Sequence, residues 1–173
     1  MFSELEGALS ELEFYSEEGK IKGSALKAGR INANNRIYPE EVVREAVNKA
    51  REKGGIPVVF ADSSIEIPTP ISSFCGVVTD LSIDEGSNLI FEASILDSPK
   101  GHLLAESLRS GMSFTASVSG YGRVEDLDGL VLVSEGYELE AVHLTPTRGT
   151  QVRKLTELEK KLLEEKACLF YSE

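Results

Sequence analysis

The sequence has few of the residues from which metal sites and disulfide frameworks are built. It contains 2 cysteines, 2 histidines and no tryptophan in 173 residues. Cys75 and Cys168 lie far apart, without a histidine or cysteine at ligand spacing, which excludes a zinc ribbon and a disulfide scaffold. His102 and His143 stand in different segments, without an HExxH-like spacing. We therefore expect no metal and no cofactor, and we interpret both cysteines as reduced, partly buried thiols.

Positive charge and long apolar runs are also scarce. Lys and Arg total 18 against 29 for Asp and Glu, which gives a formal net charge of -11 and argues against a nucleic-acid surface. The longest apolar runs, such as residues 56–61, are far too short to span a membrane, and the start "MFSELEGALSELEF" lacks the basic residues and apolar block of a signal peptide. We expect a cytosolic protein that binds neither nucleic acid nor membrane. Its hydrophobic content of 41% suits one compact domain with a substantial core.

The first half of the chain predicts one helix among strands. Pro39 is expected at the first position of this helix, acidic residues fill its first turn, and Gly54 with Gly55 marks its end. The run "IPVVFA" predicts a buried strand, and "FCGVVTDLSI" and "NLIFEASIL" predict an antiparallel pair joined by "DEGS". The expected apolar stripe of the helix comprises Val42, Val43, Ala46, Val47 and Ala50.

The second half predicts another helix, more strands and a tail. Ser98 is expected as the N-cap and Pro99 as the first residue of a helix that ends at Gly111. The run "LVLVSEGYELEAVHL" predicts one or two strands, and "TELEKKLLEEKACLF" predicts a C-terminal helix. We expect residues 1–150 to form the domain and residues 151–173 a tail. The expected apolar face of the second helix comprises Leu103, Leu104 and Leu108.

The stretch "FTASVSGYGR" carries the strongest signal for chemistry. Apolar and hydroxyl residues alternate there, so one face of a strand is apolar and the other presents Ser117 and Ser119. A serine nucleophile needs a neighbouring base, which His143 could supply from an adjacent strand. Gly120 and Gly122 would let a substrate backbone come close, but they lack the third glycine and following helix of a nucleotide loop. The alternative is an ordinary solvated strand face with a structural histidine.

Several motifs in order resemble those of a known enzyme family. The segments "NANNRIYP", "DSPKG" and "SVSGYG", with "IPVVF" between the first two, resemble the prohead (capsid maturation) serine proteases of tailed bacteriophages over residues 23–149. The resemblance implies an α+β fold similar to the herpesvirus assemblin proteases, with a closed or nearly closed, mostly antiparallel β-barrel flanked by helices. It also implies endoproteolysis of scaffold and major capsid proteins inside an assembling prohead in the host cytoplasm, with self-processing.

The resemblance also assigns site residues and exposes a departure. It puts the nucleophile at Ser117, and it leaves Ser119 where the family often has arginine. The family's catalytic histidine follows the "P-V" strand, where this chain has Ala61 or Asp62. An aspartate, with an ordinary pKa near ~4, is a weak acceptor for a serine proton at neutral pH. Either the histidine has been replaced and the chain is inert, or His143 has become the base, or the alignment through this loop is shifted.

Two further expectations depend on the resemblance. The family's third catalytic member would fall in "ELEAVHLTP", where Glu140 and His143 differ in strand parity, and we favour His143. A family-like cleavage triplet, Leu155-Thr156-Glu157, lies at the join between the core and the tail.

A different class of function stays open. The chain could be a non-catalytic structural or scaffold-associated protein with the same fold, in which the helices mediate assembly or self-association.

Overall fold

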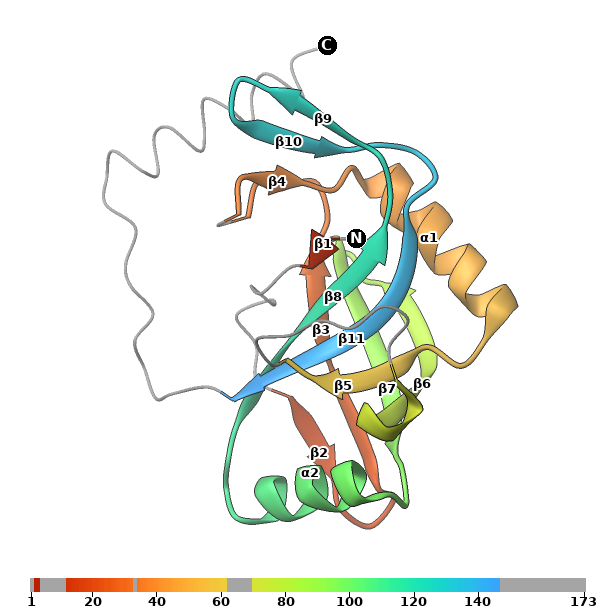
Figure 1. Cartoon of the computed structure of the whole chain (residues 1–173), viewed down its shortest axis with the longest axis vertical. Coiled ribbons are helices and arrows are strands. Elements are labelled where there is room, and N and C mark those ends of the chain that lie inside the picture. The colour runs from red at the N-terminus through yellow and green to blue at the C-terminus, as the bar shows by residue number, and fades with distance from the viewer. Residues whose placement is uncertain (1, 4–11, 33, 62–69, 147–173) are drawn as a thin grey trace.

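The computed structural model describes residues 2–3, 12–32, 34–61 and 70–146 (Figure 1). The described chain has an α+β fold in which strands predominate. None of its helices is long and apolar enough to cross a membrane. The elements in chain order are β1 (Phe2–Ser3), β2 (Glu13–Tyr15), β3 (Lys20–Lys27), β4 (Arg36–Ile37), α1 (Glu40–Lys53), β5 (Pro57–Phe60), a 3-10 turn (Ile71–Ser73), β6 (Phe74–Ile83), β7 (Asn88–Ile95), α2 (Pro99–Arg109), β8 (Phe114–Tyr121), β9 (Val124–Leu127), β10 (Leu130–Val133) and β11 (Glu138–Pro146).

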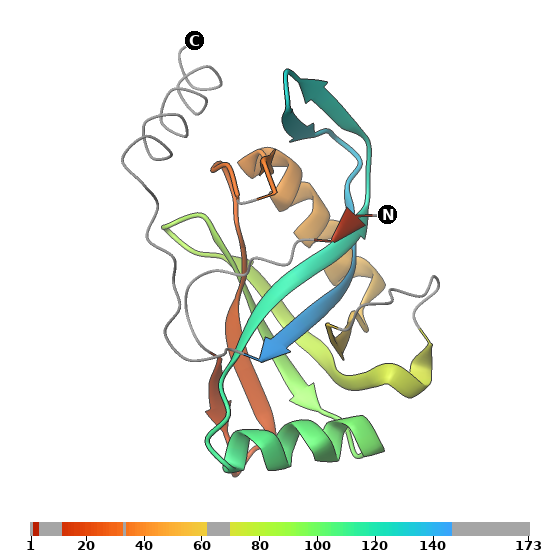
Figure 2. The ribbon, with the colours of Figure 1, turned by 60° about the vertical axis from the view of Figure 1, so that its left-hand side comes forward.

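Most strands belong to one strongly curled sheet (Figures 1 and 2). Its eight strands follow the order β1-β8-β11-β5-β6-β7-β3-β2, and all neighbours are antiparallel except β11 and β5, which are parallel. The curl brings the start of β2 back towards β8, where the Leu12 amide donates to the Phe114 carbonyl at 3.2 Å. No ladder closes the sheet among the described strands. The α+β fold with a curled, mostly antiparallel sheet is as expected, whereas closure into a barrel is not shown. The parallel pairing of β5 and β11 is possible because a long connection joins these two strands.

A small second sheet lies beyond one end of β8 and β11. It has the order β4-β10-β9, with β4 and β10 parallel. The asparagine-rich loop before β4 is held by Asn32, whose side-chain oxygen accepts from the amides of Asn34 and Arg36 at 3.0 Å each. Asn35 has a φ of 57°, a left-handed conformation that asparagine tolerates better than most residues. Asn32 and Asn35 thus stabilise the turn that leads the chain into β4.

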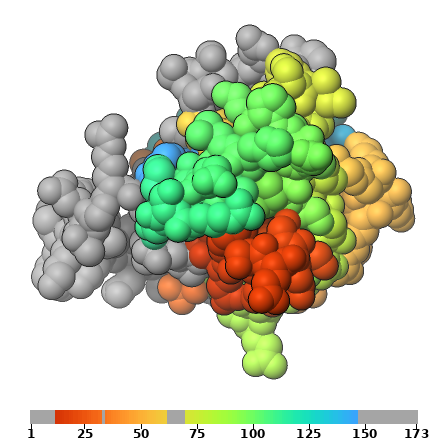
Figure 3. Space-filling view, turned by 90° about the horizontal axis from the view of Figure 1, so that it is seen from below, coloured from red at the N-terminus to blue at the C-terminus, as the bar shows by residue number. Residues whose placement is uncertain are grey.

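Both predicted helices are present, and α2 has the N-cap that its sequence predicts. α1 begins at Glu40, one residue after the expected start, since Pro39 is its N-cap, and all five residues of the expected stripe are buried. Ser98 caps α2 by accepting a hydrogen bond from the Gly101 amide at 3.1 Å. In α2 only Leu104 of the three expected leucines is fully buried, and Leu103 is exposed. α2 covers only the end of the sheet, beside the β2–β3 turn (Figures 1 and 3). A narrow apolar stripe is therefore enough to pack this helix against the sheet.

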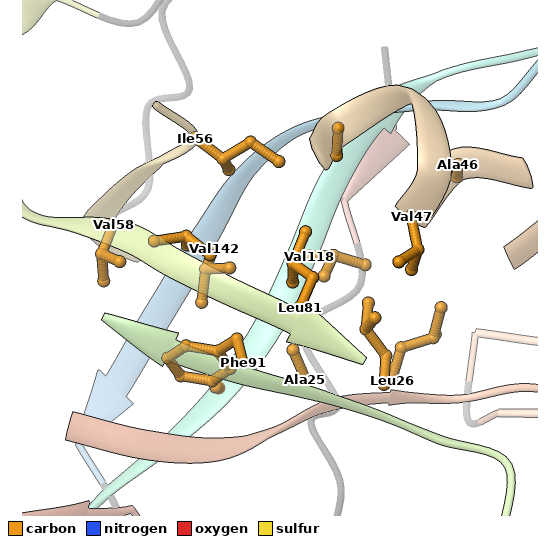
Figure 4. Close-up of a cluster of buried hydrophobic side chains, with 14 of the residues drawn as sticks. Ala25, Leu26, Ala46, Val47, Ile56, Val58, Leu81, Phe91, Val118 and Val142 are labelled. Carbon is orange, nitrogen blue, oxygen red and sulfur yellow. The ribbon is translucent and has the colours of Figure 1, made fainter. Parts of the chain in front are cut away.

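The core lies inside the curl of the sheet and is closed on one side by α1 (Figure 4). Val118 of β8, Val142 of β11 and Val58 of β5 meet Phe91 of β7 there, and Val47 packs on them from α1. Burial of such side chains contributes about 1.5–3 kcal/mol each. This packing fixes one face of β8 and β11 towards the core, and it therefore fixes which residues lie on the opposite face.

The strand predictions are mostly confirmed. The pair β6–β7 and the strands β5, β8, β10 and β11 lie where the sequence predicts strands. β9 was not predicted, because its four residues "VEDL" are all exposed and carry no apolar alternation. The predicted C-terminal helix, the tail from residue 151 and the triplet Leu155-Thr156-Glu157 lie outside the described residues.

Candidate functional site

The candidate site is built on β8 and β11, which pair antiparallel. In their register His143 lies opposite Ser117, and Ala141 lies opposite Ser119. Ala116 and Val118 point into the core, so the intervening serines and His143 share the other face. We call this face of β8 and β11 the hydroxyl face. The sequence predicted that the two serines share one face of a strand. The alternative of an ordinary solvated strand face is wrong, because both serines are buried.

A polar contact on the hydroxyl face joins His143 to Ser119. The Nε2 atom of His143 lies 2.7 Å from the Oγ atom of Ser119. The exposed fractions are 1% for Ser119, 2% for Ser117 and 5% for His143. A serine hydroxyl within hydrogen-bond distance of an imidazole nitrogen is the geometry of an activated nucleophile and its base. Nε2 can accept the hydroxyl proton when the neutral ring carries its own proton on Nδ1.

Ser117 has a different environment from Ser119. Its hydroxyl oxygen is buried and has no hydrogen-bond partner among the described residues, although its backbone is directly opposite His143. A buried hydroxyl without a partner costs about 1–3 kcal/mol, so such a group calls for an explanation. The structure thus brings together Ser117, Ser119 and His143, as expected, but the imidazole contacts the second serine of the motif instead of the first.

Ala61 directly follows β5, on the other side of β11 from β8. The Ala61 amide donates to the Leu144 carbonyl at 2.8 Å, and Val59 lies opposite His143. Strand alternation therefore places residue 61 on the same face as Val59 and His143. Ser119, His143 and Ala61 lie on one diagonal across three neighbouring strands. The methyl group of Ala61 cannot exchange a proton, and Asp62 lies outside the described residues.

The two glycines after Ser119 have a packing role. A Cβ atom at Gly120 would collide with the Glu138 carbonyl and would lie 2.5 Å from the Tyr137 hydroxyl oxygen. A Cβ atom at Gly122 would lie 3.0 Å from the Tyr137 ring. Tyr137 is buried and meets the Tyr38 ring edge-on, with the centroids 5.4 Å apart. Both glycines therefore leave room for Tyr137, and their expected role in admitting a substrate backbone stays a prediction.

The remaining titratable candidates lie away from the serine pair. His102 on α2 is exposed and contacts Asp97, with 2.6 Å between Nε2 and Oδ1. The register of β11 shifts between Leu139 and Ala141, so Glu140 occupies a β-bulge and the regular-strand parity argument does not apply to it. Tyr121 ends β8 beside this bulge. Desolvation and the Glu140 charge raise the pKa of its phenol.

Cys75 is equally remote from the reactive chemistry. It is fully buried, its Sγ donates to the Val58 carbonyl at 3.2 Å, and burial raises the pKa of its thiol to about 12. Within the described ranges, no three His, Cys, Asp or Glu side chains are grouped so that they could hold a metal ion.

Comparison with solved structures identifies a related fold. The chain superimposes on the bacteriophage T4 capsid assembly protease, gp21, with a TM-score of 0.62, covering 73% of this chain and 80% of the T4 protein. The two proteins share a fold. Their sequences are only 20% identical over the match. No protein-family model matches the chain, and no curated protein sequence does. The similarity to the T4 protease agrees with the phage prohead protease resemblance, whereas no herpesvirus-like specificity follows from it.

Proposed function

We propose that this protein is a serine endopeptidase of phage capsid assembly, with Ser119 and His143 as its reactive pair. The observation that carries the proposal is the 2.7 Å contact between His143 Nε2 and Ser119 Oγ. The contact joins the neighbouring strands β8 and β11 of a fold similar to that of the T4 capsid assembly protease. The substrates would be scaffold and major capsid proteins inside the prohead in the host cytoplasm, and self-processing would use the same site.

The reaction would use the pair as nucleophile and base. His143 Nε2 accepts the Ser119 proton while Oγ attacks the substrate carbonyl carbon, and the protonated imidazole then gives this proton to the leaving amine. Water attacks the acyl-enzyme in the second half, with His143 again as the base. The Nε2 atom must therefore be unprotonated at rest, so activity would fall in acid as the imidazole becomes charged.

Ser117, which the sequence resemblance assigns as the nucleophile, is the alternative to Ser119. Its hydroxyl has no hydrogen-bond partner among the described residues, and Ser117 lies directly opposite His143 in the strand register. A rotation of the imidazole towards Ser117 would exchange the roles of the two serines. We favour Ser119 because its hydroxyl already has the base within 2.7 Å, whereas Ser117 would need the imidazole to leave that contact.

A second candidate function follows from burial and from position 61. The three site residues are at most 5% exposed, which leaves no room for a substrate unless the covering chain moves. The resemblance implies a histidine at residue 61 or 62, and the chain has Ala61 and Asp62 there. Both observations favour a non-catalytic capsid assembly protein that retains the protease fold. This alternative retains the packing of the fold and predicts no cleavage.

One experiment separates these functions. The purified chain is incubated with a scaffold-type polypeptide rich in Leu-x-Glu triplets, beside Ser119→Ala, Ser117→Ala and His143→Ala, and intact masses are recorded over time. We expect cleavage by the natural sequence that is lost in Ser119→Ala and His143→Ala, and reduced by less than about tenfold in Ser117→Ala.

The other outcomes have distinct meanings. Loss of cleavage in Ser117→Ala, with retention in Ser119→Ala, would transfer the nucleophile to Ser117. Retention of cleavage in all variants would indicate a contaminating protease. Absence of cleavage by the natural sequence, with the folded state confirmed by circular dichroism, would support the non-catalytic function.

A further inference from the structure

The edge of β8 beside the serine pair is occupied by a distant segment of the same chain. β1 pairs antiparallel with β8, with Phe2 opposite Gly120 and Ser3 opposite Ser119. β1 is the outermost strand of the sheet on this side, so β8 would otherwise be an edge strand. An edge strand presents unpaired backbone groups that accept an extended peptide.

The backbone groups available at this edge can be assigned. The Phe114 carbonyl accepts from the Leu12 amide, and Leu144 directs its carbonyl to β5. Alternation along both strands then turns the odd residues of β8 towards β11 and the even residues, from Phe114 to Gly120, towards β1. The ladder with β1 reaches only Ser119 and Gly120, and no described strand pairs with the edge at Ala116 and Val118.

We propose that β1 is an internal occupant of a peptide-binding edge on β8, and that an extended peptide binds there by displacing it. The peptide would run antiparallel to β8 across Ala116 to Gly120. Its backbone would pass Ser119 at the position where β1 places Ser3. Cleavage of the bound peptide rests on the proposed protease function. Binding of the peptide to β8 does not.

The physical reason for a self-occupied edge is competition within one chain. A tethered segment has an effective concentration on the order of millimolar, so a free peptide of equal intrinsic affinity competes poorly. The described ladder of β1 comprises the pairs Phe2–Gly120 and Ser3–Ser119. A peptide that pairs with more residues of β8 than these two would therefore compete more effectively with β1 than a shorter one.

The test uses the full chain with matched proline variants. Proline removes one backbone N–H. The amide of Phe2 faces β8, because Phe2 is opposite Gly120, whereas the amide of Ser3 points to the other edge of β1. Phe2→Pro should free the edge, Ser3→Pro should leave β1 in place, and Phe2→Ala controls for the loss of the ring. The probe is a fluorescent peptide with the sequence of residues 1–8, measured by fluorescence polarisation.

We expect Phe2→Pro to bind the probe about five- to tenfold more tightly than the natural sequence, since one hydrogen bond contributes about 1–1.5 kcal/mol. Ser3→Pro and Phe2→Ala should bind like the natural sequence. A probe that is N-methylated at Phe2 should lose binding to Phe2→Pro, and one that is N-methylated at Ser3 should keep it. Equal binding by all chains, absence of binding to Phe2→Pro, or equal effects of the two methyl groups would each overturn the proposal.

Binding and cleavage are then compared in the same samples. A peptide extended to ten residues, with a Leu-x-Glu triplet at its centre, is incubated with Phe2→Pro and followed by mass spectrometry. Tight binding without cleavage would contradict the proposed protease function and leave the peptide-binding edge intact. Cleavage that is no faster in Phe2→Pro than in Ser3→Pro would overturn the role of β1 as the occupant.

Discussion

The imidazole of His143 hydrogen-bonds to Ser119, although the residue opposite it in the strand register is Ser117. Its Nε2 atom lies 2.7 Å from Ser119 Oγ, on the diagonal between β11 and β8. Diagonal neighbours in a sheet are within reach of a long or aromatic side chain, and an imidazole spans that distance. The two serines of the motif therefore differ: the Ser119 hydroxyl has the imidazole as a hydrogen-bond partner, whereas the Ser117 hydroxyl has no partner among the described residues.

The Ser119–His143 contact should appear as a coupling in unfolding measurements. Removal of either side chain breaks this buried hydrogen bond, so each single alanine variant should lose about 1–3 kcal/mol. The double variant should lose less than the sum, with a coupling of at least about 0.5 kcal/mol in a double-mutant cycle followed by urea unfolding. The same cycle with Ser117 is the matched control. Equal coupling for both serines would contradict the selective contact.

A titratable side chain at position 61 should increase any cleavage. Residue 61 lies on the same face as His143 and completes the diagonal from Ser119, where a third group could orient and stabilise the imidazolium. We expect Ala61→His to raise the cleavage rate by about 10²-fold or more, measured as intact mass against time. Ala61→Asn, which is polar but does not titrate, should have little effect. An equal gain from asparagine would assign the effect to packing.

Gly120→Ala should destabilise the protein strongly. The added methyl group would collide with the Glu138 carbonyl and the Tyr137 hydroxyl, both of which are fixed by the sheet and the core. We expect a loss of about 3 kcal/mol in the free energy of unfolding, at the upper end of the cost of overpacking. Gly122→Ala, which approaches only Tyr137 at 3.0 Å, should lose less, about 1 kcal/mol. A larger loss of stability in Gly122→Ala than in Gly120→Ala would contradict the close packing at Gly120.

Ser98→Ala should remove the N-cap of α2. The Ser98 hydroxyl accepts from the Gly101 amide at 3.1 Å and donates to the Phe74 carbonyl at 3.2 Å, which ties the helix to β6. Loss of a serine cap costs about 1 kcal/mol, detectable as a lower midpoint in urea. Ser110→Ala, at the exposed C-terminal end of the same helix, should change stability by less than about 0.5 kcal/mol. A larger effect at Ser110 than at Ser98 would refute the assigned cap.

Cys75 should be unreactive in the folded protein and should make stability depend on pH in the alkaline range. Burial raises the pKa of its thiol to about 12. Iodoacetamide at pH 8 should therefore leave Cys75 unmodified in the folded chain and modify it in urea, as mass mapping would reveal. Modification of folded Cys75 would contradict its burial.

The sign of the pH dependence follows from the two states of the Cys75 thiol. Above about pH 8.5 the unfolded thiol loses its proton while the folded thiol keeps it. The stability that the neutral, buried thiol contributes is thus fully present below pH 8.5 and is lost as the pH rises towards 12. The stability advantage of the natural sequence over Cys75→Ala should shrink over this range, by at most about 1.4 kcal/mol per pH unit. An advantage that stays constant would place the folded pKa near its ordinary value.

Local patterns in the sequence were sufficient for much of the fold. Both helices, the N-cap at Ser98 and the strand pair β6–β7 depend on neighbouring residues, since caps, periodicity and turns act over a few positions. The alternation in "FTASVSGYG" likewise determined that Ser117 and Ser119 share a face. The exposed strand β9 and the parallel pairing of β11 with β5 could not be predicted, because neither leaves a local apolar pattern.

The sequence by itself determined that two serines lie on one strand face and that the chain offers few bases to activate them. Only the tertiary structure decided which serine meets the histidine, because that depends on the register between β8 and β11, which brings together Ser119 and His143, 24 residues apart in the sequence. The bulge at Glu140 and the space left by Gly120 for Tyr137 set how this strand pair is packed. The burial of the pair and the pairing of β1 beside it are also long-range results, and local residue preferences carry no information about them.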